Sequence, residues 1–167
     1  QLISTSGGAS SQTLGSLSTA NGFNTVRATA TAGGSATWDV TGAWTQGAGA
    51  TTLFAGTLLG TSSVIKFGTA PTMVGGLIPG ADGNNSSPAE TGIDKYDVTN
   101  GVLLLAPGDY QSGFGAGGNV SLSLSPSAIA TQTINSLRST ATATVSFNPG
   151  AVLSVTSGQI LATTGTL

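Results

Sequence analysis

The chain has 167 residues, of which 38% are hydrophobic and only 6% are charged, with a formal net charge of −2, no His and no Cys. The absence of Cys excludes a disulfide framework and thiolate metal sites, and four scattered cations offer no basic surface for nucleic acid. Disordered chains are typically poor in apolar residues and rich in charge, so this composition favours an ordered protein.

The first third of the chain predicts short β-strands separated by Gly turns. Residues 25–31 (TVRATAT) alternate between apolar or small and polar side chains, and Gly33-Gly34 follows shortly after them. Period-two alternation places one set of side chains on each face of a strand. Helical periodicity is nearly absent, because Gly, Ser and Thr interrupt every window. No apolar run approaches the ~18 residues that a membrane-spanning helix needs.

The middle of the chain differs in composition from both flanks. Residues 60–110 hold five of the six acidic residues. Within them, residues 80–90 (GADGNNSSPAE) are polar and rich in turn-forming residues. We therefore expect a polar loop excursion around residues 80–97 that leaves the body of the fold.

The last third returns to alternating strands, and it repeats a pattern from the beginning. Residues 120–125 (VSLSLS) and 141–147 (ATATVSF) both alternate. The segment Thr13–Leu17 (TLGSL) recurs toward the other end of the chain as Thr133–Leu137 (TINSL). Many short strands with internal repetition indicate an all-β protein, with a β-solenoid preferred and a β-sandwich as the alternative. We expect one solenoid domain over 1–167.

Several short motifs stand in a definite order along the chain. None is specific alone, but the order is. They are LGT at 59–61, IKFGTAPT at 65–72, GLIP at 76–79, TGIDKYD at 91–97, NGV at 100–102, INSLR at 134–138 and LSVTSGQILA at 153–162.

In this order the motifs resemble the autotransporter-associated β-strand repeat proteins, large surface or secreted proteins that are abundant in planctomycete-like bacteria. The resemblance covers roughly residues 10–167 and implies a right-handed parallel β-helix of the passenger type, exposed on the cell surface. Gln159 departs from the pattern, since the family usually has Gly there. We expect no C-terminal membrane barrel within these residues, so the resemblance does not imply an outer-membrane anchor for them.

The two ends of the chain predict self-association. Both are uncharged and strand-like, and the open edge of a β-fold invites pairing with another chain unless charge, Pro or a cap blocks it. At roughly 20 residues per coil, we expect seven or eight coils. The chain begins at Gln1, as a processed protein or a fragment would, and in a fragment the exposed ends carry no meaning. The residues assigned to end-to-end contacts are Leu2, Ile3, Ile160 and Leu161.

The acidic middle segment is a candidate Ca²⁺ site. Hard cations bind several carboxylate, amide and carbonyl oxygens. The alternative is an Asp- and Asn-rich turn without metal. No other cofactor is expected. The candidate ligands are Asp82, Asn84, Glu90, Asp94 and Asp97.

Trp38 and Trp44 flank Asp39 and offer two interpretations: rings that stack on a glycan, or rings packed in the core. The five Phe residues are interpreted as core or cap residues. Parallel β-helices also host polysaccharide lyases and hydrolases, but no His is present, and Lys95 between Asp94 and Asp97 is the only acid–base cluster. We therefore expect no catalytic residues.

Three functions follow in order of preference. The first is a structural extracellular protein, a subunit or segment of a bacterial cell-surface fibre or filament that forms by end-to-end strand stacking. The second is an adhesin passenger that binds a glycan or matrix surface. The third is a carbohydrate-active enzyme. The expected partner is a further copy of the chain, without nucleic acid or a membrane span.

Overall fold

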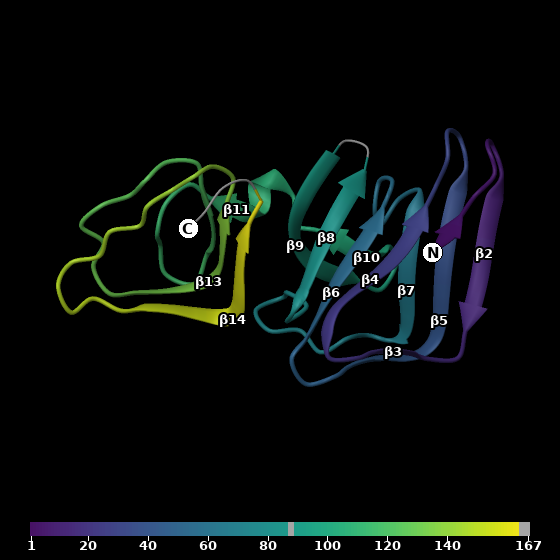
Figure 1. The fold of residues 1–167 in the computed structure, drawn as a ribbon, viewed down its shortest axis with the longest axis horizontal. Coiled ribbons are helices and arrows are strands. Elements are labelled where there is room, and N and C mark those ends of the chain that lie inside the picture. The colour runs from purple at the N-terminus through teal and green to yellow at the C-terminus, as the bar shows by residue number, and fades with distance from the viewer. Residues whose placement is uncertain (87–88, 164–167) are drawn as a thin grey trace. The chain divides into compact units, whose positions relative to one another are not determined.

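The computed structural model describes residues 1–86 and 89–163, and the side chains of residues 89 and 90 lie outside that description. The described chain is nearly all β-structure, arranged as about six turns of parallel stacked coils, which confirms the predicted solenoid (Figure 1). Only the short 3-10 turn Pro107–Asp109 is helical in the described part, so no described helix is long and apolar enough to cross a membrane.

The coils fall into two compact units, where the sequence predicts one domain over 1–167. We call residues Gln1–Leu104 the N-terminal unit and Leu105–Leu167 the C-terminal unit. The N-terminal unit contains β1 (Leu2–Ile3), β2 (Ala9–Leu14), β3 (Leu17–Thr19), β4 (Gly22–Thr29), β5 (Ser35–Gln46), β6 (Ala50–Gly56), β7 (Ser63–Thr69), β8 (Ala81–Ser86), β9 (Ala89–Asp97) and β10 (Gly101–Leu104). The C-terminal unit contains β11 (Tyr110–Gln111), β12 (Asn119–Leu122), β13 (Gln132–Ser139) and β14 (Leu153–Ala162).

In the N-terminal unit each strand of the two main ladders pairs in parallel with the strand one coil later. β1, β4, β6 and β8 form one parallel ladder, and β2, β5 and β7 form a second. Leu2 pairs with Ala28, and Gly22 pairs with Ala50. Both pairs are further apart in the sequence than the roughly 20 residues expected for one coil. Longer coils explain why the chain makes about six turns instead of seven or eight.

The long strand β5 bends from one face of the coil to the next, and Gly residues occupy the bend. Its first part pairs with β2, its last part pairs with β3, and the register to β7 shifts between Val40 and Ala43. A Cβ atom at Gly42 would collide with the carbonyl oxygen of Gly15 in the coil before it. A Cβ atom at Gly68 would collide in the same way with the carbonyl of Thr41. Glycine at this bend therefore permits close stacking of successive coils.

Aromatic rings fill the interior of the N-terminal unit. Trp44 packs edge-on against Phe54, with ring centroids 5.2 Å apart, and lies stacked 6.0 Å from Phe67. Phe67 in turn packs 5.8 Å from Tyr96. Ring pairs at these separations are attractive beyond the area they bury. The rings come from β5, β6, β7 and β9, so they connect successive levels of the unit.

The segment expected to be a polar loop around residues 80–97 is a β-hairpin. β8 continues the parallel ladder from β6, and β9 then pairs antiparallel with both β8 and β10. Pairing with β6 thus overrides the turn preference of Asp82, Gly83 and Asn84. The Tyr96 hydroxyl accepts a hydrogen bond from the Phe67 N–H (2.9 Å) and donates one to the Phe67 carbonyl (2.8 Å). This contact caps β7 on the side where its parallel ladder has no further described strand.

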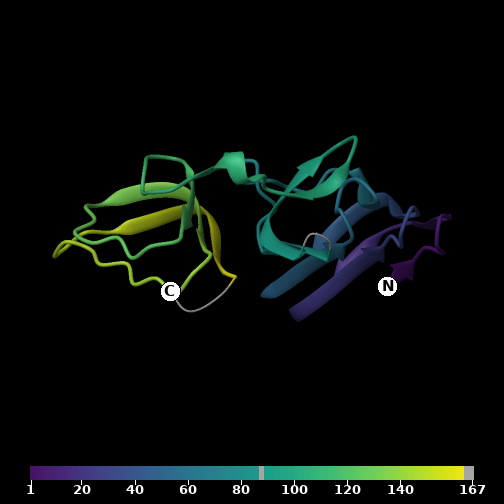
Figure 2. The ribbon, with the colours of Figure 1, turned by 90° about the horizontal axis from the view of Figure 1, so that it is seen from above.

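The C-terminal unit has shorter coils and a smaller core. β11, β12, β13 and β14 form one parallel sheet, and β13 and β14 run side by side (Figures 1 and 2). Asn119 pairs with Ser136, and Gln132 pairs with Leu153, so one coil here takes up fewer residues than a coil of the N-terminal unit. The core is aliphatic and consists of Val120, Leu122, Ile134 and Leu137, with Phe114, Val145, Leu153 and Val155 packed against it.

The alternating run 141–147, which the sequence predicts as a strand, is irregular apart from one bridge between Ile129 and Phe147. The segment beside it explains this outcome. Thr144 N–H donates to the Ser125 hydroxyl and Ser146 N–H donates to the Pro126 carbonyl. Pro126 has no N–H to return a ladder bond, so the ladder is interrupted here and resumes only at Ile129, which bonds to Ser146 and Asn148.

Candidate functional site

The candidate functional site consists of four edge strands, β1, β2 and β3 in the N-terminal unit and β14 in the C-terminal unit. β11, whose single described strand partner is β12, is a further edge strand of the C-terminal unit and is not part of this site. β1 pairs only with β4, and β2 and β3 pair only with β5, within the described chain. In the C-terminal unit, β14 has β13 as its single described strand partner. A strand with one partner leaves a row of N–H and C=O groups on its other side, which can template a further strand.

The four residues assigned to self-association lie on these outer strands. Leu2 and Ile3 form β1, with Ile3 55% exposed and Leu2 half-buried against the aromatic core. Ile160 and Leu161 lie on β14, with Ile160 59% exposed. The structure thus places both pairs at an open strand edge, one pair in each unit.

Ile160 ends a column of apolar side chains in the C-terminal unit. Val120 pairs with Leu137, and Leu137 pairs with Ile160. Val120 and Leu137 are buried in the aliphatic core. Ile160 occupies the next level of the same column without a described coil beyond it, which accounts for its exposure.

The first coil of the N-terminal unit has a corresponding apolar opening. A cavity of about 160 Å³ is lined there by residues of the first two coils. Leu14 and Leu17 are half-buried and pack against the aromatic core from this side. The lining residues are Gln1, Leu14, Leu17, Thr25, Val26, Arg27, Trp38 and Val40.

Polar side chains at the β13–β14 bend form a connected network. Asn135 donates from Nδ2 to Asn119 Oδ1 (2.8 Å), and the Ser136 hydroxyl donates to the same oxygen (3.0 Å). Thr156 donates to Asn135 Oδ1 (3.2 Å), which joins β14 to the network. Asn135 and Ser136 are buried, so these bonds satisfy polar groups that would otherwise be costly. This hydrogen-bond network stabilises the bend at which β14 changes direction.

The structure brings Asp82 near Asp94 but forms no three-ligand metal cluster from the proposed calcium ligands that it describes. Asp97 Oδ1 accepts the N–H groups of Thr99 and Asn100, which is the bonding of an Asx turn. Asn84 donates from Nδ2 to the Thr91 hydroxyl. No cluster of three or more His, Cys, Asp or Glu side chains suited to a metal occurs among the described residues. The Glu90 side chain lies outside them.

Asp94 is the unusual member of that acidic set. It is 0% exposed, and neither carboxyl oxygen has a hydrogen-bond partner in the described structure. Asp94 lies over Gly83, where a Cβ atom would overlap its carboxylate, and beside the Leu104 side chain. Burial raises the pKa of Asp94 well above the usual range, and the nearby charge of Asp82 raises that pKa further. Burial also raises the pKa of Asp82.

The two tryptophans do not form a common exposed platform. Trp44 is 9% exposed, lies among the aromatic rings of the core, and donates from Nε1 to the Thr19 hydroxyl. Trp38 is half-buried against the same core and donates to the Arg27 carbonyl (2.8 Å). The core-packing interpretation therefore applies to Trp44, which has no free face to offer a sugar.

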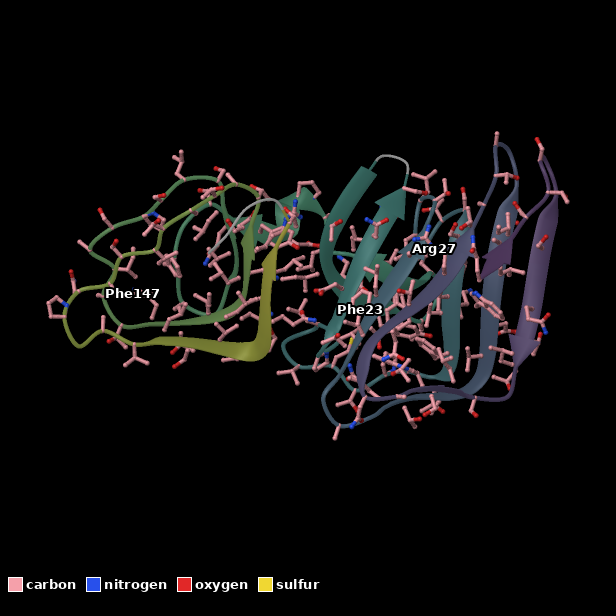
Figure 3. The ribbon with its side chains drawn as sticks, viewed as in Figure 1. Phe23, Arg27 and Phe147 are labelled. Atoms are coloured by element: carbon pink, nitrogen blue, oxygen red, sulfur yellow. The ribbon has the colours of Figure 1, made fainter. Side chains whose placement is uncertain are left out.

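One aromatic residue that the sequence assigns to the core or a cap is strongly exposed. Phe23 is 72% exposed on β4, the strand that also carries Arg27 (Figure 3). Phe54 and Phe67 are buried as expected, and Phe147 packs 6.1 Å from Phe114. Phe23 stands directly after Gly22, at the beginning of β4, on the outward side of the strand.

Sequence reasoning missed the contribution of Gly15, Gly42 and Gly68. They recur once per coil of the N-terminal unit, so their regular spacing is the signal that could have revealed a glycine-lined bend. Comparison with known proteins adds no further assignment: no protein-family model, no curated protein and no solved structure gives a significant match to this chain.

Proposed function

We propose that this chain is a structural element of an extracellular or cell-surface fibre, which grows when the outer strands of successive copies of the chain stack end to end. The observation that carries the proposal is that each unit has an open parallel edge, formed by β1 to β3 in the N-terminal unit and by β14 in the C-terminal unit. The added strand belongs to a second copy of the chain.

The chemistry of these strands suits stacking. No charged side chain lies in β1, β2, β3 or β14. Charged residues, especially Lys, are what soluble proteins commonly use to blunt an exposed edge. The solvent-facing positions carry mostly Ser, Thr and Gln, which keep a strand hydrated without electrostatic repulsion between identical copies. Such edges accept a neighbouring strand at low cost.

Two further observations support an extracellular setting. The order of short motifs resembles the autotransporter-associated β-strand repeat proteins, whose passengers stand outside the cell. The chain also has only four Lys and Arg residues, which leaves few cleavage sites for trypsin-like proteases. Dense backbone ladders further resist the local opening that proteolysis requires. The role proposed is accordingly structural and not catalytic.

The proposal is tested by the concentration dependence of association. Purified protein is examined by sedimentation velocity across a wide concentration range and by negative-stain electron microscopy at the highest concentration. We expect the sedimentation coefficient to rise with concentration and elongated particles to appear. A single, concentration-independent monomer with dispersed particles in the micrographs would reject the proposal.

A further inference from the structure

Neither the backbone conformation nor the packing within the described chain requires glycine at Gly15. It stands at the bend between β2 and β3, directly below Gly42 in the stack. Its φ is not positive, and a Cβ atom built on it meets nothing within 4 Å. By contrast, Gly42 and Gly68 need glycine because each lies against the carbonyl of the coil before it. Gly15 thus leaves room for a preceding coil, which the described chain does not supply.

The apolar residues on the two sides of the Gly15 bend have the same spacing in the sequence as those on the two sides of the bend in β13. In β13, Ile134 pairs with Val155 and Leu137 pairs with Ile160 across the bend. The same interval joins Leu14 to Leu17, within the repeated pattern TLGSL and TINSL. The β2–β3 edge therefore presents two apolar residues at the same separation as the two β13 residues that pair with β14.

The apolar surfaces on the two edges complement each other. Ile160 is exposed at the end of the column that begins with Val120 and Leu137. Leu14 and Leu17 line the cavity of about 160 Å³ beside the first coil. Stacking in the register of β13 on β14 places Val155 against Leu14 and Ile160 against Leu17. The apolar surfaces that these side chains expose would then leave water, which favours association.

We propose that the β14 bend of one copy seats beneath the Gly15 bend of the next copy, which makes the assembly polar and head-to-tail. This inference rests on the proposed function and names its contact. Parallel pairing requires the C-terminal edge of one copy to meet the N-terminal edge of another, because two like edges would pair antiparallel. Such a heterologous contact extends as a filament where its rotation does not close, and forms a ring where it does. Coil lengths differ between the two units, so pairing is confined to the bend.

The most direct test substitutes Gly15→Ala. The isolated chain has room for this methyl group, so we expect unchanged circular dichroism and thermal stability. In the assembly, the new Cβ would strike a carbonyl of the partner's β14 bend, as a Cβ at Gly42 would strike Gly15. We expect association to weaken by roughly tenfold or more, the effect of about 1.4 kcal/mol. The matched control is Gly108→Ala, which also meets nothing within 4 Å and lies in the 3-10 turn, outside the outer strands.

A second test uses the absence of Cys in the chain. Thr13 and Ser154 are both exposed, and the proposed register makes them neighbours across the contact. A mixture of the single variants Thr13→Cys and Ser154→Cys should form a disulfide-linked heterodimer on mild oxidation, because neighbouring strands place Cα atoms within disulfide range. Ser11→Cys mixed with Ser154→Cys is out of register and should cross-link at least several-fold less.

The outcomes separate this inference from the function on which it rests. Assembly of the wild type that Gly15→Ala does not weaken, or equal cross-linking in and out of register, would overturn the proposed contact and leave fibre formation intact. A wild type that stays monomeric under all conditions would overturn both. Loss of assembly in Gly15→Ala with an intact fold, together with register-specific cross-linking, would establish the contact.

Discussion

The two units use the same parallel ladder but fill their coils in different ways. The longer coils of the N-terminal unit enclose the packed rings of Trp44, Phe54, Phe67 and Tyr96, whereas the shorter coils of the C-terminal unit have a largely aliphatic core. The C-terminal unit also buries a hydrogen-bonded network around Asn135. The two units therefore differ mainly in what fills their coils, with packed rings in the N-terminal unit and aliphatic side chains in the C-terminal unit.

The largest expected effect concerns the aromatic core. Phe67→Ala removes a ring that touches Trp44, Phe54 and Tyr96, and we expect a loss of about 3–5 kcal/mol in unfolding free energy. Phe147→Ala in the C-terminal unit should cost less, because that ring is only half-buried. Chemical denaturation measures both variants. Equal losses would show that ring packing is not what distinguishes the two units.

The next effect concerns the polar network of the C-terminal unit. Asn135→Ala removes a bond to Asn119 and leaves the Thr156 hydroxyl without its side-chain acceptor, at a cost of about 2–3 kcal/mol. The control is Asn24→Ala on β4, a side chain bonded to backbone carbonyls near the surface, which should cost less than about 1 kcal/mol. Hydrogen exchange should locate the loss of protection in β13 and β14. Unchanged protection there would contradict a structural role for the network.

A somewhat smaller effect is expected at the glycine bend of the N-terminal unit. Gly68→Ala forces a Cβ atom against the Thr41 carbonyl, so we expect a loss of about 1–3 kcal/mol. Gly113→Ala in the C-terminal unit meets no atom within 4 Å and should change stability by less than about 0.5 kcal/mol. Thermal melting of the two variants provides the measurement. Similar melting temperatures would show that the bend has more room than its backbone indicates.

The pH dependence of stability should belong to the N-terminal unit. The pKa of Asp94 is raised in the folded chain, so the unfolded chain releases its proton first as pH increases. Stability is therefore greatest below the unfolded pKa near 4 and is lost as pH rises toward the folded pKa, with a slope of at most about 1.4 kcal/mol per pH unit for one proton.

Asp94→Asn and Asp94→Leu should both flatten this slope, since neither side chain ionises. Amide exchange measured from about pH 5 to about pH 8 should show the loss of protection in β8, β9 and β10 of the wild type and not in the two variants. A pH slope that survives in both variants would remove Asp94 as its cause. If protection in the C-terminal unit fell with pH to the same extent, the pH dependence of stability would not belong to the buried acid of the N-terminal unit.

Local alternation and turn chemistry predicted much of the fold. Residues 25–31 overlap β4, residues 120–125 overlap β12, and the repeat at Thr13 and Thr133 marks the bend in both units. The failures all involve long-range pairing. Asp82 to Ser86 form a strand because β6 and β9 pair with them, and 141–147 do not because Pro126 interrupts the neighbouring ladder.

The sequence predicted only part of the candidate site. The positions of Leu2, Ile3, Ile160 and Leu161 at strand edges followed from their uncharged flanks. The burial of Asp94 did not, because it depends on the space that Gly83 leaves across the hairpin. Trp44 was recognisable as a ring that fits either a core or a surface, and only the coil geometry places it inside.

The central claim is that parallel coils continue from one copy to the next through their open edges. X-ray fibre diffraction from aligned, concentrated protein tests it most directly. Continuous stacking predicts a meridional reflection at about 4.8 Å, the spacing of hydrogen-bonded strands along the axis. Aligned fibres that lack this reflection, or protein that yields no fibres at any concentration, would contradict the account.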